Sequence, residues 1–117
     1  MSVNRGDVVL VDYPFTDRRG SKVRPALVVQ ADILNHHITD TILAAVSRST
    51  HRASATQLFV DISTAEGSQT GLRQNSMIQC ENLLTFDQRF IIAKIGDMPP
   101  ALLRQIDACL KAELDLP

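Results

Sequence analysis

The feature that most constrains the fold is a series of short apolar, β-branched runs, each closed by polar or turn-forming residues. Runs of this length and composition predict β-strands, and they stand at residues 7–13, 23–30, 41–46, 57–62, 76–81, 83–86 and 90–95. The segments 14–22, 47–56 and 63–75 between them are polar or rich in turn-forming residues, which predicts loops. We expect Asp32 to cap a short turn after the second strand.

The pattern changes only near the C-terminal end. Pro99 and Pro100 suit a helix start, and four apolar residues then recur three or four positions apart, at Leu103, Ile106, Leu110 and Leu114. This spacing predicts an amphipathic helix from about residue 100 to 115 that packs one face on the sheet. Many closely spaced strands with one terminal helix indicate a mainly β protein with a C-terminal α-helix. The sheet is expected to be a small antiparallel barrel or strongly coiled, without βαβ units.

Composition narrows the class of protein. A chain of 117 residues without repeats or linkers is expected to form a single domain, 1–117. The net charge of −1 argues mildly against a nucleic-acid partner, although a local basic patch would suffice.

Cys80 and Cys109 lack metal-ligand spacing and predict reduced thiols. There is no apolar leader and no membrane-length segment, so we expect a soluble, cytoplasmic protein.

Four blocks carry a family resemblance when they are taken in order. They are RGDVVLVD at 5–12, RPALVV at 24–29, AAVS at 44–47, and GL at 71–72 followed by SMIQCENLLTFD at 76–87. Together with the terminal helix, they resemble the MazF/PemK family of toxins from bacterial toxin–antitoxin pairs. The resemblance implies an SH3-like antiparallel barrel of the CcdB/PemK type, assembled as a homodimer. It also implies metal-independent, sequence-specific cleavage of single-stranded RNA, with messenger RNA the expected class, and a cognate antitoxin whose disordered tail covers the RNA-binding groove.

The resemblance gives catalytic roles to Arg24, Ser47 and Glu81. Metal-free cleavage needs a base for the ribose 2′-OH, positive charge at the phosphoryl oxygens and an acid for the leaving 5′ oxygen. Arg24 offers forked donors that match a phosphate, although its spacing alone favours a salt bridge. Ser47 ends the third strand, where a serine is more often a turn former. Glu81 is the expected proton acceptor, although a lone glutamate on an edge strand is usually solvated.

Two polar loops supply further candidates for RNA contact. Single charged loop residues are usually solvated, but two basic loops beside Arg24 would make a groove that follows a nucleic-acid backbone. The predicted RNA-binding residues are Phe15, Thr16, Arg18, Arg19, Lys22, Arg48, His51, Arg52 and Gln79. Phe15 is the expected stacking residue, whereas Phe59, Phe86 and Phe90 are assigned to the core. His36 and His37 are adjacent in sequence and poorly placed for joint metal binding, so no metal site is predicted.

Two other functions stay open. Some members of the family carry an arginine where this chain has Gln79 or Leu84, which leaves room for a non-catalytic member. The other is a CcdB-like toxin that binds a protein such as gyrase. That reading is disfavoured because the chain has no tryptophan and ends in Glu-Leu-Asp-Leu-Pro. Alternation along residues 78–81 predicts that Gln79 and Glu81 share one side of a strand, opposite Ile78 and Cys80.

Overall fold

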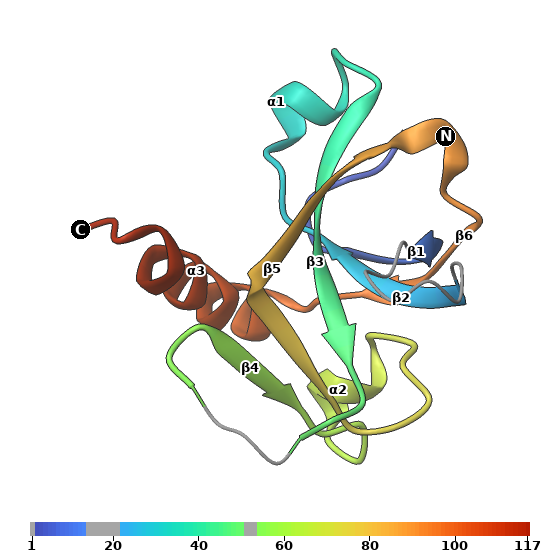
Figure 1. Ribbon diagram of the computed structural model, residues 1–117. Helices are drawn as coiled ribbons and strands as arrows, with labels where there is room; N and C mark the ends of the chain where they lie inside the picture. The colour runs from blue at the N-terminus through green and yellow to red at the C-terminus, as the bar shows by residue number, and fades with distance from the viewer. Residues whose placement is uncertain (1, 14–21, 51–53) are drawn as a thin grey trace.

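The computed structural model, which describes residues 2–13, 22–50 and 54–117, shows a curled antiparallel sheet with a helix beside it (Figure 1). Its six strands lie in the order β4-β5-β3-β2-β1-β6. Their bounds are β1 (Asp7–Tyr13), β2 (Lys22–Val28), β3 (Asp40–Ser47), β4 (Gln57–Val60), β5 (Ser76–Asp87) and β6 (Ala93–Asp97). The connections contain the short helices α1 (Asp32–Asn35), α2 (Ala65–Ser68) and η1 (Gln88–Phe90). The structure therefore agrees with the mainly β, antiparallel fold class that the sequence predicts.

Both faces of the sheet bury apolar side chains, because successive residues of a strand point to opposite faces. Val8 and Leu27 belong to one core cluster, which also contains Ile106 of helix α3 (Pro100–Leu114). Val9 and Val28 belong to a second cluster inside the curl of the sheet. This double burial explains why the strands read as almost continuous apolar runs and show little alternation.

Strand β5 is one bent strand where the sequence predicts two. Ala45 of β3 pairs with Gln79, but its neighbour Ala44 pairs with Leu83, so residues 80–82 have no partner on β3. Extra residues on one strand of a pair bend it, and the bend is visible near the middle of β5 in Figure 1. The interruption lies where the two predicted strands were separated, and it lets β5 contribute Ile78 to the first cluster and Leu84 to the second.

The two ends of the strand order are brought together by the segment after α2. Asp97 N of β6 donates to Gln69 O at 2.9 Å. Gly71 approaches the same strand so closely that a Cβ atom there would lie 2.0 Å from Ile95 O. The chain that leaves β4 therefore packs beside β6, and the sheet curls into a half-barrel.

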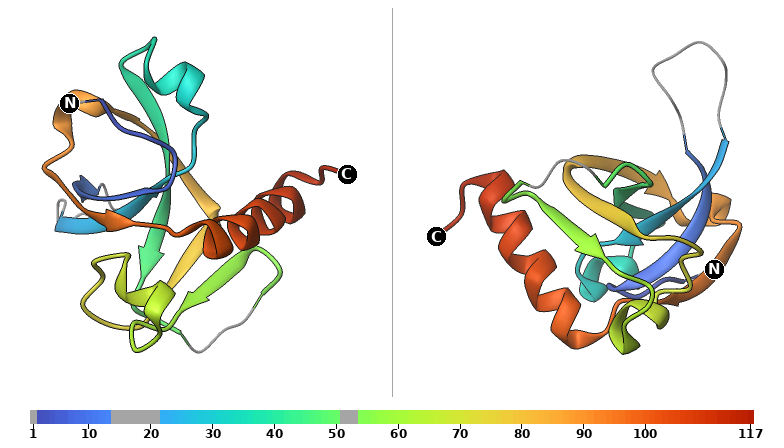
Figure 2. Two further views of the ribbon diagram at one scale, coloured as in Figure 1. Left: turned by 180° about the vertical axis from the view of Figure 1, so that it is seen from behind. Right: turned by 90° about the horizontal axis from the view of Figure 1, so that it is seen from below.

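Helix α3 confirms the predicted C-terminal helix. Pro100 occupies its first turn, and the left-handed Asp115, at φ 54°, follows its last residue. Its buried side chains, Ile106 and Cys109, meet the first cluster, and the helix lies alongside β4 in both views of Figure 2. No helix in the described part of the chain is long and apolar enough to cross a membrane.

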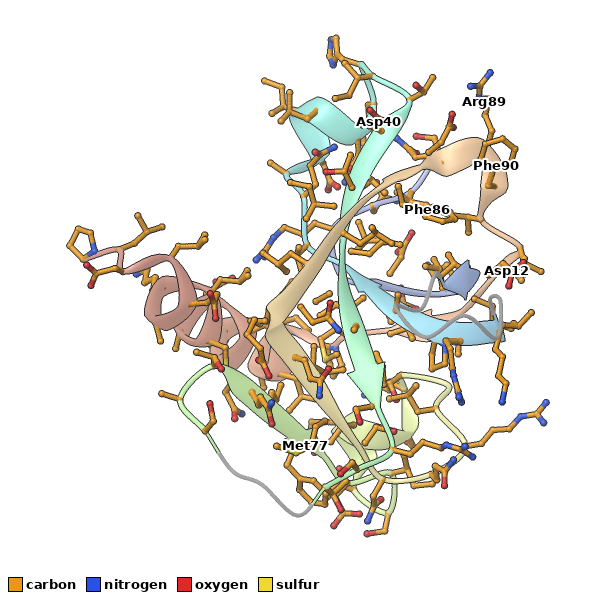
Figure 3. The ribbon with its side chains drawn as sticks, viewed as in Figure 1. Asp12, Asp40, Met77, Phe86, Arg89 and Phe90 are labelled. Carbon is orange, nitrogen blue, oxygen red and sulfur yellow. The ribbon has the colours of Figure 1, made fainter. Side chains whose placement is uncertain are left out.

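Three local predictions were wrong. Phe90 and Phe59 are 67% and 47% exposed, because Phe90 lies on the turn before β6 and Phe59 on the face of β4 opposite the buried Leu58. Figure 3 shows Phe90 at the rim, whereas Phe86 lies inside the curl and packs against the second cluster as predicted. Asp32 makes no cap, since it is already the first residue of α1, and its carboxylate accepts a hydrogen bond from Arg5 N at 2.6 Å.

Candidate functional site

A cleft of about 1010 Å³ opens where β2, the end of β3 and the middle of β5 meet the segment between α2 and β5. Its lining comes from parts of the chain that are far apart in sequence. The lining residues are Leu10, Val23, Arg24, Pro25, Ala45, Val46, Ser47, Arg48, Ser49, Gly71, Leu72, Arg73, Gln74, Ser76, Gln79, Asn82 and Ile95.

The cleft is basic although the chain is not. Its described lining contains the arginines Arg24, Arg48 and Arg73 but no aspartate or glutamate, while the whole chain carries a net charge of −1. Several carboxylates are instead paired elsewhere, as in the ion pairs Arg5–Asp107, Arg89–Asp87, Lys94–Asp7 and Lys94–Asp97. A water-filled recess with charge of one sign concentrates ligands of the opposite sign, so the cleft suits a polyanion.

Arg24 and Ser47 come together in this cleft as the sequence predicts. Arg24 is half-buried on β2 and pairs with Val11 of β1, and Ser47 is the last residue of β3. The Ser47 hydroxyl oxygen accepts a hydrogen bond from Ser49 N at 3.1 Å. A hydroxyl that accepts through its oxygen still has its hydrogen to donate, so Ser47 is equipped to bind an anionic oxygen.

Glu81 lies beside the cleft and is not one of its lining residues. Ile78 and Cys80 are buried while Glu81 is exposed, which confirms the predicted alternation. The Glu81 carboxylate accepts from Thr56 Oγ1 at 3.1 Å and from the side-chain amide of Gln57. Gln57 is the β4 partner of Gln79, so the carboxylate is one cross-strand neighbour away from a lining residue.

The remaining predicted contacts divide into three groups. Arg48 and Gln79 line the cleft beside Arg24 and Ser47. Lys22 is exposed at the start of β2 and is not part of the lining. The predicted contacts Phe15, Thr16, Arg18, Arg19, His51 and Arg52 lie outside the described residues.

Arg73, Gln74 and Asn82 line the cleft without having been singled out from the sequence. Arg73 sits in the polar segment predicted to be a loop, where an isolated charge carries no distinctive signal. The preceding residue, Leu72, is large and apolar in a polar segment, which indicates that its side chain is buried. That signal could have shown that this part of the loop packs against the core. Asn82 lines the cleft from the bulge of β5, which the sequence marked only as a gap between strands.

Among the described residues, neither the two cysteines nor His36 and His37 belong to the cleft lining. Cys80 and Cys109 are buried free thiols in the first cluster, and burial raises the pKa of Cys80 to about 12. His36 and His37 follow α1, where their rings contact Asn4 Oδ1 and Ile33 O. Within the described ranges, no three His, Cys, Asp or Glu side chains converge on a metal site.

Comparison with known proteins identifies the family. The sequence model of the PemK-like, MazF-like toxin of type II toxin–antitoxin systems matches residues 4–114. The chain belongs to this family. Among its relatives, the endoribonuclease EndoA of Bacillus subtilis (strain 168) is 30% identical over 99% of this chain and 97% of its own. The endoribonuclease MazF6 of Mycobacterium tuberculosis (strain H37Rv) is 27% identical over 99% and 100%.

Solved structures of PemK/MazF-like toxins share the fold. A mycobacterial endoribonuclease in complex with its cognate antitoxin aligns with a TM-score of 0.80 at 21% identity, over 98% of this chain and 97% of that one. MazF in a MazE-MazF crystal from Deinococcus radiodurans gives 0.71 at 18% identity and covers all of both chains. These similarities confirm the predicted mainly β, PemK-like fold.

Proposed function

We propose that this chain is the toxin of a type II toxin–antitoxin pair and cleaves single-stranded RNA at short specific sequences. The observation that carries the proposal is the cleft with three arginines and no carboxylate in its described lining, on a chain whose net charge is −1. Family membership and the relatives named as endoribonucleases support the same reaction class.

The proposed chemistry is attack of the ribose 2′-OH on the adjacent phosphorus. The P–O5′ bond breaks, the leaving O5′ takes a proton from water, and the products are a 2′,3′-cyclic phosphate and a 5′-OH end. Arg24 would offset the charge that develops on the phosphoryl oxygens, because a guanidinium presents two parallel donors and is always charged. Ser47 would donate its hydroxyl hydrogen to one of those oxygens.

We propose that the Glu81 carboxylate accepts the proton of the ribose 2′-OH. Its carboxylate is exposed and neighbours the lining residue Gln79 through Gln57. Bound RNA would have to draw this carboxylate away from Thr56 and Gln57. The glutamine variant keeps the shape of the side chain but removes the proton acceptor, so it tests this role directly.

We further propose that a cognate antitoxin neutralises the protein by covering the cleft and that the pair acts in the cytoplasm. An acidic peptide tail would be attracted by the same positive charge that attracts RNA. The similarity to an endoribonuclease solved with its cognate antitoxin supports this partner class.

The deciding experiment is cleavage of a long single-stranded RNA by the purified protein in EDTA. It compares wild type with Arg24→Ala, Glu81→Gln and the control Lys111→Ala, whose exposed side chain lies on α3 away from the cleft. We expect specific cuts by wild type and by the control. Loss of one phosphoryl-stabilising donor or one proton-transfer group should slow cleavage by about 100-fold or more.

The products and the controls separate the alternatives. End analysis should show cyclic phosphates and 5′-OH groups. Wild type that binds RNA without cutting any of a broad set of sequences would identify a non-catalytic member of the family. Wild type that neither binds nor cuts RNA would overturn the proposed function. Full activity of Glu81→Gln would remove that residue from the mechanism and leave the reaction in place.

A further inference from the structure

We propose that Arg73 is a second phosphate-binding residue of this cleft and holds the RNA backbone on the wall formed by the segment between α2 and β5. The inference rests on the proposed ribonuclease function and adds a binding residue to it. Arg24 lies on β2 and Arg48 directly follows the last residue of β3, whereas Arg73 comes from the segment between α2 and β5. Positive charge therefore enters the cleft from more than one wall.

The backbone on both sides of Arg73 is anchored. Leu72 is buried in the first core cluster, and its N–H donates to Thr70 Oγ1 at 3.3 Å. On the other side, the buried Ser76 donates its hydroxyl hydrogen to Gln74 O at 2.9 Å. A charged side chain on an ordered backbone loses less conformational freedom when it binds a ligand. The backbone that carries Arg73 is therefore fixed at the cleft.

The guanidinium of Arg73 is available to a ligand. Arg73 is exposed, and within the described part of the chain its side chain takes part in none of the ion pairs or hydrogen bonds. Arg5, in contrast, uses its donors inside the protein. Its Nε donates to Val29 O at 2.8 Å, and its Nη2 donates to Asp107 Oδ1 at 2.7 Å. A solvent-exposed guanidinium next to a lining whose described residues include no carboxylate fits a phosphate group.

Among the described lining residues, those that come from β5 include no cation. Gln79 lines the cleft with a neutral amide, and Leu84 packs against the second apolar cluster. The segment that precedes β5 supplies positive charge to the cleft through Arg73.

Binding of an RNA that cannot be cleaved tests the proposal. The probe is an oligonucleotide that contains the protein's own cut sequence, with 2′-O-methyl groups in place of the 2′-OH groups. Fluorescence anisotropy at 50 to 200 mM salt would compare wild type with Arg73→Ala, Arg73→Lys and Arg104→Ala. Arg104 is the matched control because it is an exposed arginine on α3 outside the cleft lining.

Loss of Arg73 should weaken binding and reduce its dependence on salt. We expect Arg73→Ala to bind about 5- to 20-fold less tightly at low salt, and the slope of log K against log salt to become shallower by about 0.7. Arg73→Lys should recover most of both quantities, and Arg104→Ala should match wild type. Thermal melts of all variants should coincide. Within the described part of the chain, the Arg73 side chain makes no hydrogen bond or ion pair that the substitution would remove.

The outcomes are distinguishable from failure of the proposed function. If wild type binds and cleaves RNA while Arg73→Ala keeps the same affinity and salt slope, the inference is wrong and the ribonuclease function stands. If Arg104→Ala weakens binding as much as Arg73→Ala does, the effect is one of overall charge and the inference is again wrong. If wild type itself does not bind RNA, the proposed function fails and the inference fails with it.

Discussion

Arg5 and Arg73 have the same side chain, and their surroundings give them different tasks. Arg5 joins the start of β1 to helix α3 through Val29 O and Asp107, so its donors are used inside the protein. Arg73 lines the cleft without such partners among the described residues. At this scale, the contacts of a charged group separate a structural role from a binding role, and residue type does not.

Gly71 lets the segment that carries Arg73 pack closely against β6. Its φ of +71° lies in the left-handed region, and an added Cβ would meet Ile95 O at 2.0 Å. Gly71→Ala should therefore lower the free energy of unfolding by about 2–4 kcal/mol, because strain and a backbone clash act together. Urea denaturation measures the loss.

Gly6→Ala is the matched control for this prediction. Gly6 also has a positive φ, +95°, but its nearest neighbour to an added Cβ is a Leu103 side-chain carbon at 3.4 Å. Only the conformational cost of about 1 kcal/mol is expected there. Equal losses at both glycines would contradict the role of the close approach to β6.

Among the elements, α3 and the bend of β5 meet at a pair of buried thiols. Cys80 lies in the bulge and Cys109 on the helix, and both belong to the first apolar cluster. Burial raises the pKa of both thiols, that of Cys80 from 9.0 to about 12. Deprotonation of either thiol would therefore place a charge in the apolar cluster and destabilise this contact between strand and helix.

The raised pKa of Cys80 should make the folded protein less stable at alkaline pH. Above pH 9 the unfolded chain loses the Cys80 proton, but the folded protein keeps it until about pH 12. The folded state then binds more protons, so the free energy of unfolding falls as pH rises through this window. Cys80→Ala should lose less stability between pH 8 and 11 than wild type does, as measured by urea denaturation at each pH.

Val60→Ala is the control for the alkaline prediction. It opens a hole in the same cluster but removes no titratable group. It should be less stable than wild type at every pH, with a pH dependence parallel to that of wild type. A parallel curve for Cys80→Ala as well would show that the thiol does not cause the alkaline loss.

At the scale of the whole molecule, the uneven placement of carboxylates explains how an almost neutral chain presents a basic recess. The pairs Arg89–Asp87 and Lys94–Asp97 neutralise charge on other surfaces. Positive charge in the cleft is left without carboxylates in the described lining. Net charge was therefore a poor guide to the partner, because binding depends on the local field.

We expect the intact protein to be a C₂ homodimer. Ile33 on α1, Phe90 on η1 and Ile92 just before β6 are each more than half exposed, at 73%, 67% and 55%. Pairing two copies through such residues would remove apolar surface from water. Light scattering at micromolar concentrations should give twice the chain mass. A monomer mass across that range would contradict the prediction.

Much of the fold was readable from the sequence because the patterns that specify it are local. A run of β-branched residues or a period of 3.6 depends only on neighbours, so α3 and β1 to β4 were predicted to within two residues at each end. Strand β5 was predicted as two strands, and β6 was predicted at 90–95 where the structure has an η1 turn and then a strand at Ala93–Asp97. Arg24, Ser47, Arg48 and Gln79 were found as cleft residues through family-like blocks at the ends of those strands and the loop beside them. Their chemical roles stay predictions, as do those of the loop residues outside the described ranges.

Other features depend on contacts between residues far apart in the chain, and only the tertiary structure decided them. The bulge of β5 arises from its register with β3, and it brings Asn82 into the cleft. The exposure of Phe59 follows from which face of β4 the sheet buries. Arg73 lines the cleft because Gly71 packs against β6 and Leu72 enters the core. None of these partners is a neighbour in sequence, so no local pattern could report them.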